Sequence, residues 1–150
     1  GNSFLNRQKV QLGNNYLEVK QLSVEKENVN SEEITIRTLS PISTYSTLYR
    51  KDGKKFTYYF NPKEKEFAEM IENNLKNKYR AFYSEEPPES EMDIKPLGST
   101  RLSIVKYKGF IIKGYTGKFI MKGIPSLLQL GLDTGLGSKN SQGFGCVKLI

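Results

Sequence analysis

The order of strand-like and helix-like segments from residue 33 onward constrains the fold more than any other feature of the sequence. Alternating apolar residues indicate strands, and apolar residues three and four apart indicate helices. The expected segments are strands at 33–48 and 56–60, a helix at 62–80, a short strand at 91–96, a β-hairpin at 99–107 and 109–121, a helix at 124–132 and a strand at 144–149. Apart from the short segments at 56–60 and 91–96, the order is strand, helix, strand, strand, helix, strand, which predicts an α+β, ferredoxin-like (β-α-β-β-α-β) domain. This fold hosts many functions, so it decides little about activity.

The helix at 62–80 carries the clearest local signals. Asn61 is a good N-cap, Pro62 occupies the first helical position, and Glu64 follows the cap by three residues. Its apolar face is formed by Phe67, Met70, Ile71, Leu75 and Tyr79. The cations near its end, Lys76, Lys78 and Arg80, fit stabilisation of the helix dipole better than contact with a ligand.

Three residues indicate irregularities in the strands. Pro41 interrupts the strand at 33–48 because proline cannot donate to a ladder. In the hairpin, Gly114 and Gly117 indicate bulges or a close approach of another backbone.

The first thirty residues are expected to belong to a different unit. Residues 8–12 and 16–24 resemble two strands around a turn, and the polar stretch 25–32 is the best linker candidate. We therefore expect residues 1–30 to be the last strands of a preceding ferredoxin-like domain and residues 31–150 to be a second such domain. The first residue is Gly1, which suggests that the sequence is part of a longer chain.

Composition favours a polyanionic partner and disfavours several kinds of chemistry. Lys and Arg number 23 against 16 Asp and Glu, a net charge of +7, which suits nucleic acid, although excess lysine can simply maintain solubility. There is no histidine, and Cys146 is the only cysteine, so a structural zinc site and an internal disulfide are not expected. We expect no cofactor, no metal, no membrane span and a cytoplasmic location.

The segment 131–145 is the most informative, with five glycines in fifteen residues. Glycine permits positive φ, and successive backbone N–H groups can then form a nest that binds anions. Lys139 supplies a cation, and Ser138, Asn140, Ser141 and Gln142 supply further polar groups, so the segment suits phosphates. The alternative is a tight connection between a helix and the last strand. The dinucleotide fingerprint fails because Gly143 is the next glycine after Gly137, and no phosphate-loop motif is present.

The same segment resembles a known family. Gly135-Leu136-Gly137, Ser138-Lys139-Asn140-Ser141-Gln142 and Gly143-Phe144-Gly145 are together similar to the C-terminal glycine-rich motif of the repeat-associated (RAMP) superfamily. The form is close to that of the CRISPR-associated endoribonucleases that cut precursor RNA at its repeats, in antiviral defence. Ser40-Pro41-Ile42 and the helix 62–80 lie where these enzymes have matching elements of their second domain.

The resemblance implies an RNA-binding role and names its residues. These are Gly135, Gly137, Ser138, Lys139, Asn140, Ser141, Gln142, Gly143, Phe144 and Gly145, to which the hairpin lysines Lys118 and Lys122 are added as cations. It implies a parent enzyme in which the RNA 2′-hydroxyl attacks the adjacent phosphate without a metal, leaving a 2′,3′-cyclic phosphate. The family's catalytic residues lie in its first domain, so no catalytic residue is assigned here and the chain alone is expected to be inactive.

Other interpretations stay open. The chain could instead be a non-catalytic RAMP subunit that binds guide RNA among other Cas subunits, or an interaction domain that binds no nucleic acid. Tyr45, Tyr49, Tyr58 and Tyr59 could stack on bases, but ordinary strand packing is the preferred interpretation. Uncovered strands at 8–24 would favour a homodimer.

Overall fold

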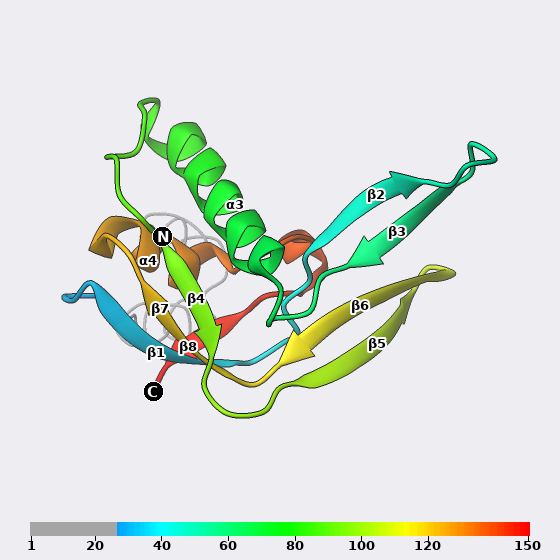
Figure 1. The fold of residues 1–150 in the computed structure, drawn as a ribbon. Helices are drawn as coiled ribbons and strands as arrows, with labels where there is room; N and C mark the ends of the chain where they lie inside the picture. The colour runs from blue at the N-terminus through cyan, green and yellow to red at the C-terminus, as the bar shows by residue number, and fades with distance from the viewer. Residues whose placement is uncertain (1–26) are drawn as a thin grey trace, which may run out of the picture.

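The computed structural model describes residues 27–150 and shows an α+β fold with antiparallel sheets (Figure 1). The strands expected at 8–24, and the homodimer expected from them, lie outside the described residues. The elements are β1 (Glu33–Thr38), β2 (Tyr45–Tyr49), β3 (Lys55–Tyr59), α3 (Lys65–Tyr83), β4 (Asp93–Pro96), β5 (Arg101–Tyr107), β6 (Phe110–Thr116), β7 (Lys118–Lys122), α4 (Pro125–Thr134), the 3₁₀ turn η1 (Asn140–Gln142) and β8 (Val147–Leu149).

Four strands form the central sheet, in the order β4-β7-β1-β8, and every neighbouring pair is antiparallel. Both helices pack on one face of this sheet, where alternate residues of the strands are buried. The core includes Ile34, Ile36, Phe119 and Met121 from the strands, Phe67, Ile71 and Leu75 from α3, and Leu127, Leu128 and Leu130 from α4. Phe67 stacks on Phe119 with the ring centroids 5.9 Å apart. The opposite face of the sheet carries mainly polar side chains of the same strands, such as Thr35, Arg37 and Lys118, together with Ile120.

Two hairpins, β2–β3 and β5–β6, are separate two-stranded sheets that project together to one side of the central sheet (Figure 1). The Tyr59 hydroxyl of β3 donates to the carbonyl oxygen of Ile111 in β6 at 3.1 Å, so the two hairpins touch. Ile42 and Tyr115 form a bridge that ties the base of the second hairpin to the chain after β1.

The strand expected at 109–121 is wrong in one respect, because the chain breaks at Gly117 into β6 and β7 in two different sheets. Gly117 has φ of +153°, its N–H donates to the Thr38 hydroxyl at 3.0 Å, and its carbonyl accepts the Thr38 N–H. A Cβ there would come within 3.1 Å of Thr100. The close approach expected at this glycine is therefore present, and it ends the hairpin.

The start and end of the first helix also differ from the expected 62–80. Residues 61–64 form a turn in which the Asn61 side chain accepts the Lys63 N–H at 2.9 Å and the Glu64 carboxylate accepts the Asn61 N–H at 2.7 Å. These bonds hold Glu64 in an extended conformation (ψ 139°), so α3 begins at Lys65. It ends three residues later than expected, at Tyr83, where Ser84 adopts a left-handed conformation. Among residues 27–150, no helix is long and apolar enough to cross a bilayer.

Candidate nucleic-acid interface

The glycine-rich loop runs from the end of α4 to β8 and is pinned at both ends against the segment 40–43. The Ser138 N–H donates to the Ser43 carbonyl and the Gly145 N–H donates to the Pro41 carbonyl, each at 2.7 Å. The Leu136 N–H in turn donates to the Gly145 carbonyl at 2.9 Å. Gly135, Leu136, Gly137, Phe144 and Gly145 are all buried, and we call these five residues the inner half of the loop.

Glycine is required in the inner half because backbones meet there. Gly137 has φ of +70°, and a Cβ added to it would overlap the Ser43 carbonyl oxygen. Gly145 has φ of +80°, and its Cβ would overlap the Leu136 carbonyl oxygen. These two glycines therefore serve the fold of the loop directly, by letting it lie against the segment after β1.

Lys78 and Asn140 fasten the loop from beneath. The Asn140 side-chain N–H₂ donates to the carbonyls of Leu136 (3.0 Å) and Phe144 (2.9 Å), which closes the loop across its neck. The Lys78 ammonium of α3 donates to the Asn140 side-chain oxygen at 2.6 Å and to the Gly135 carbonyl at 2.9 Å. Burial lowers the pKa of Lys78.

The tip of the loop is formed by the remaining residues, of which the first two are half-buried: Ser138, Lys139, Ser141, Gln142 and Gly143. Ser141, Gln142 and Gly143 are exposed, and Gly143 (φ +93°) has no atom within 4 Å of where its Cβ would be. Within the described residues, the backbone N–H groups of Lys139 and Ser141 have no hydrogen-bond partner. Lys139 takes a left-handed conformation (φ +65°) and holds its ammonium 5.3 Å from the centre of the Tyr45 ring. The tip therefore combines backbone donors with a cation, the groups from which an anion-binding nest is built.

Lys118 belongs to a second group of positively charged side chains, which lies on the face of the sheet away from the helices. It is directly opposite Arg37 of β1, which is also directly opposite Lys148 of β8. Opposed residues share a face, and like charges so placed repel one another. In the part of the chain that the structure describes, none of the three has a carboxylate partner. We call these residues the cationic row; a bound polyanion would relieve their repulsion.

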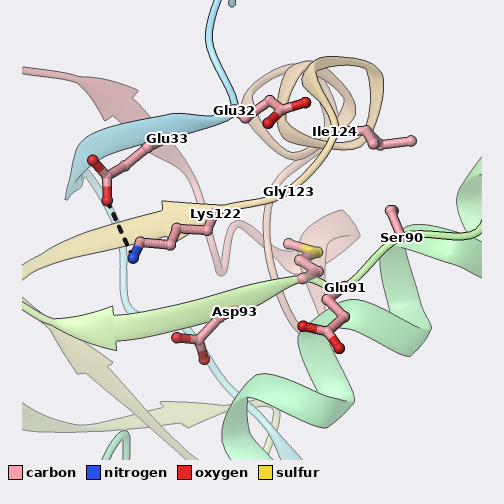
Figure 2. A pocket seen from close by; sticks show the side chains of 9 residues that line it. Glu32, Glu33, Ser90, Glu91, Asp93, Lys122, Gly123 and Ile124 are labelled. Carbon is pink, nitrogen blue, oxygen red and sulfur yellow. Dashed lines mark ion pairs between the residues drawn. The ribbon is translucent and has the colours of Figure 1, made fainter.

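Lys122 lies apart from the loop and in acidic surroundings (Figure 2). It is opposite Glu33 at the start of β1, whereas the loop contacts the chain beyond Thr38 at the other end of that strand, about 16 Å away. Its ammonium is 3.6 Å from the Glu33 carboxylate. The hollow beside it has a volume of about 780 Å³ and is lined by four carboxylates, those of Glu32, Glu33, Glu91 and Asp93. These charges repel phosphates.

Sequence reasoning missed the part that Lys78 plays. In the sequence, stabilisation of the helix dipole is a sufficient reason for a lysine at this position. In the structure its hydrogen-bond partners are Gly135 and Asn140, 57 and 62 positions later in the chain. No local pattern could identify it, because the contact depends on how α3 packs beside α4. Among residues 27–150, no group of three or more Asp, Glu, Cys or His residues could hold a metal ion.

The sequence is similar to known proteins over nearly all of its length. The family model described as "CRISPR associated protein Cas6, C-terminal" matches residues 23–149. The CRISPR-associated endoribonuclease Cas6 of Pyrococcus furiosus is 35% identical over 99% of this chain and 54% of its own length. Cas6 1 of Methanocaldococcus jannaschii is 34% identical over 75% of this chain and 43% of its own length. The chain thus spans about half the length of the curated relatives it matches.

Solved structures give the same result. A Cas6-related protein from Pyrococcus furiosus superposes with a TM-score of 0.75 and 21% identity, covering 84% of this chain and 51% of that one. Another, described as CRISPR associated protein Cas6, has a TM-score of 0.68 and 31% identity, covering 78% of this chain and 48% of that one. The resemblance to the RAMP endoribonucleases is therefore confirmed, and the chain belongs to the family of the Cas6 C-terminal part.

Proposed function

We propose that this chain is the RNA-binding C-terminal domain of an endoribonuclease that processes CRISPR precursor RNA. The observation that carries the proposal is the tip of the loop, where Lys139 lies beside backbone N–H groups that have no partner among residues 27–150, next to a buried, hydrogen-bonded inner half. Its chemistry suits the phosphates of RNA. Family membership supplies the reaction class, and the net charge of +7 favours attraction of a polyanion.

In the proposed reaction, the parent enzyme cleaves within repeats by attack of the RNA 2′-hydroxyl, giving a 2′,3′-cyclic phosphate. That step needs a base, an acid and cations for the phosphorane. These 150 residues contain no histidine. In the proposed reaction they therefore position the RNA and supply positive charge, and Lys139 is the proposed phosphate ligand. The alternative, a guide-RNA subunit without catalysis, uses the same tip.

We further propose that residues 31–150 form one ferredoxin-like domain, preceded in 1–30 by the end of another. The sheet order supports this, because β8-β1-β7-β4 corresponds to the order 4-1-3-2 of four strands joined through two helices. The two projecting hairpins are then insertions, one after β1 and one before β7.

A reducing, cytoplasmic setting is consistent with the single cysteine.

The test is the binding of a CRISPR repeat RNA, followed by fluorescence anisotropy at several salt concentrations. Lys139→Gln should weaken binding and make the slope of log affinity against log salt shallower by about 0.7 to 1, the loss of one phosphate contact. Lys122→Gln is the matched control, since it removes the same charge from acidic surroundings, and it should change the slope much less. Absence of RNA binding by the unmodified chain, or equal effects of the two changes, would overturn the proposal.

A further inference from the structure

A pocket of about 430 Å³ lies where the two hairpins meet the tip of the loop. Its lining includes the aromatic side chains of Tyr45, Tyr59 and Phe110, together with Thr57, Lys139 and Gln142. Three separate parts of the chain therefore contribute: β2–β3, the turn and start of β6, and the loop. Its size is within the range of small-molecule sites, which are apolar clefts with a few placed polar groups.

The aromatic side of the pocket is held in place before any ligand arrives. Tyr45 and Tyr59 are directly opposite each other on β2 and β3, with ring centroids 5.7 Å apart. The Tyr59 hydroxyl is fixed on the Ile111 carbonyl of the other hairpin. Across from them, Phe110 is 73% exposed, a large aromatic surface for a side chain at the mouth of a pocket. The exposed ring of Phe110 and the half-buried rings of Tyr45 and Tyr59 border a preformed hollow, which suits a planar ligand.

The pocket also has a fixed charge of the right sign. Lys139 stands over Tyr45, and its charge reaches Tyr59: burial raises the pKa of the Tyr59 hydroxyl, while the Lys139 ammonium opposes this rise. Four carboxylates are among the residues that line the hollow beside Lys122 (Figure 2), whereas no carboxylate lines the pocket between the hairpins. An anionic ligand is therefore accepted between the hairpins and repelled beside Lys122.

We propose that this pocket holds one unstacked RNA base among Tyr45, Tyr59 and Phe110, with the phosphate of that nucleotide on Lys139. A base is planar and apolar on its faces, and the phosphate attached to it is an anion, so one nucleotide matches both parts of the site. Gln142 and Thr57 at the rim provide donors and acceptors for the edge of the base. The inference rests on the proposed RNA binding, and it adds the step in which a base leaves the stack.

The experiment compares two probes with the full chain: an oligoadenylate about ten nucleotides long and an abasic ribose-phosphate strand of equal length. Phe110→Ala should lower the affinity for oligoadenylate by about fivefold to a hundredfold, as loss of one stacked base does, and leave the affinity for the abasic strand unchanged. Lys139→Gln should weaken both strands alike. Phe82→Ala is the matched control: Phe82 is also mostly exposed (64%) but lies near the end of α3, away from the pocket, and should change neither affinity.

Each outcome decides one question. If Phe110→Ala weakens both strands equally, or neither, the base pocket is refuted while RNA binding stands. If the unmodified chain binds neither strand, the proposed function itself fails. Tyr45→Leu tests the same pocket through another of its aromatic side chains, and it should cause the same loss of preference for oligoadenylate over the abasic strand as Phe110→Ala. Because Phe110 is mostly exposed, its replacement leaves the folded core intact.

Discussion

Alanine at Gly137 should destabilise the protein clearly more than alanine at Gly143, although both glycines belong to the same loop. Their φ values are +70° and +93°, so each alanine costs about 1–2 kcal/mol for a left-handed conformation. At Gly143 nothing else is added, because no atom lies within 4 Å of the new Cβ. The Gly143→Ala change therefore measures the cost of backbone conformation alone.

At Gly137 the new Cβ meets the Ser43 carbonyl oxygen, and the fully buried Ser43 has little room to move. To make room for the Cβ, the loop must move away from the segment that contains Ser43, and this movement breaks the 2.7 Å hydrogen bond from the Ser138 N–H to the Ser43 carbonyl oxygen. Loss of a buried hydrogen bond adds about 1–3 kcal/mol. The expected totals are about 2–5 kcal/mol for Gly137→Ala and about 1–2 kcal/mol for Gly143→Ala.

Urea unfolding followed by circular dichroism measures both variants, with an unchanged slope expected for each. If the two free energies of unfolding agree within about 0.5 kcal/mol, the loop is not pinned on Ser43 and our reasoning about the inner half is refuted. A role of Gly137 in touching RNA would give a different result: unchanged stability with reduced RNA affinity.

Three further predictions concern α3. Lys78→Met removes the donor to Asn140 and should cost about 1–3 kcal/mol in urea unfolding, against about 0.3–0.5 kcal/mol for Lys76→Met, which loses only an i,i+4 ion pair; equal costs would contradict the brace beneath the loop. Since burial lowers the pKa of Lys78 below its ordinary 10.5, the unfolded chain binds more protons between these two values. The free energy of unfolding of the wild type should therefore rise relative to Lys78→Met as pH increases through that window, and a constant or falling difference would refute it. Phe67→Ala, at a fully buried ring, should cost about 3–5 kcal/mol, whereas Phe82→Ala should stay within about 0.5 kcal/mol.

Much of the fold follows from local patterns in the sequence. The apolar spacing of Phe67, Ile71 and Leu75 predicts α3, and these same residues are buried. Pro125 predicts the start of α4, which begins there. What the patterns could not predict is where a strand changes sheet: apolar residues continue on both sides of Gly117, and the break depends on Thr38, 79 positions earlier.

The glycine-rich loop shows the same limit at the candidate site. Its composition predicts positive φ values, and Gly135, Gly137, Gly143 and Gly145 all have them. Composition does not predict which backbone N–H groups of the loop remain without a hydrogen bond. The carbonyl groups that accept from the other N–H groups belong to the segment after β1 and to the loop itself. Only Gly143 of these four is exposed. The division into an inner half and a tip is a property of the packed structure.

In the proposed RNA interface, this division gives a role in binding to residues that touch no phosphate. A flexible loop would have to lose conformational freedom when it binds, and that loss opposes affinity. Here the Asn140 side chain closes the neck, Lys78 holds Asn140, and the inner glycines allow the close backbone contacts. The ordering of the loop is thus part of folding, and the tip meets its ligand already formed. In the proposed interface Lys78 and Lys139 therefore have different roles: Lys78 sets the position of the tip through Asn140, and Lys139 is the proposed phosphate ligand.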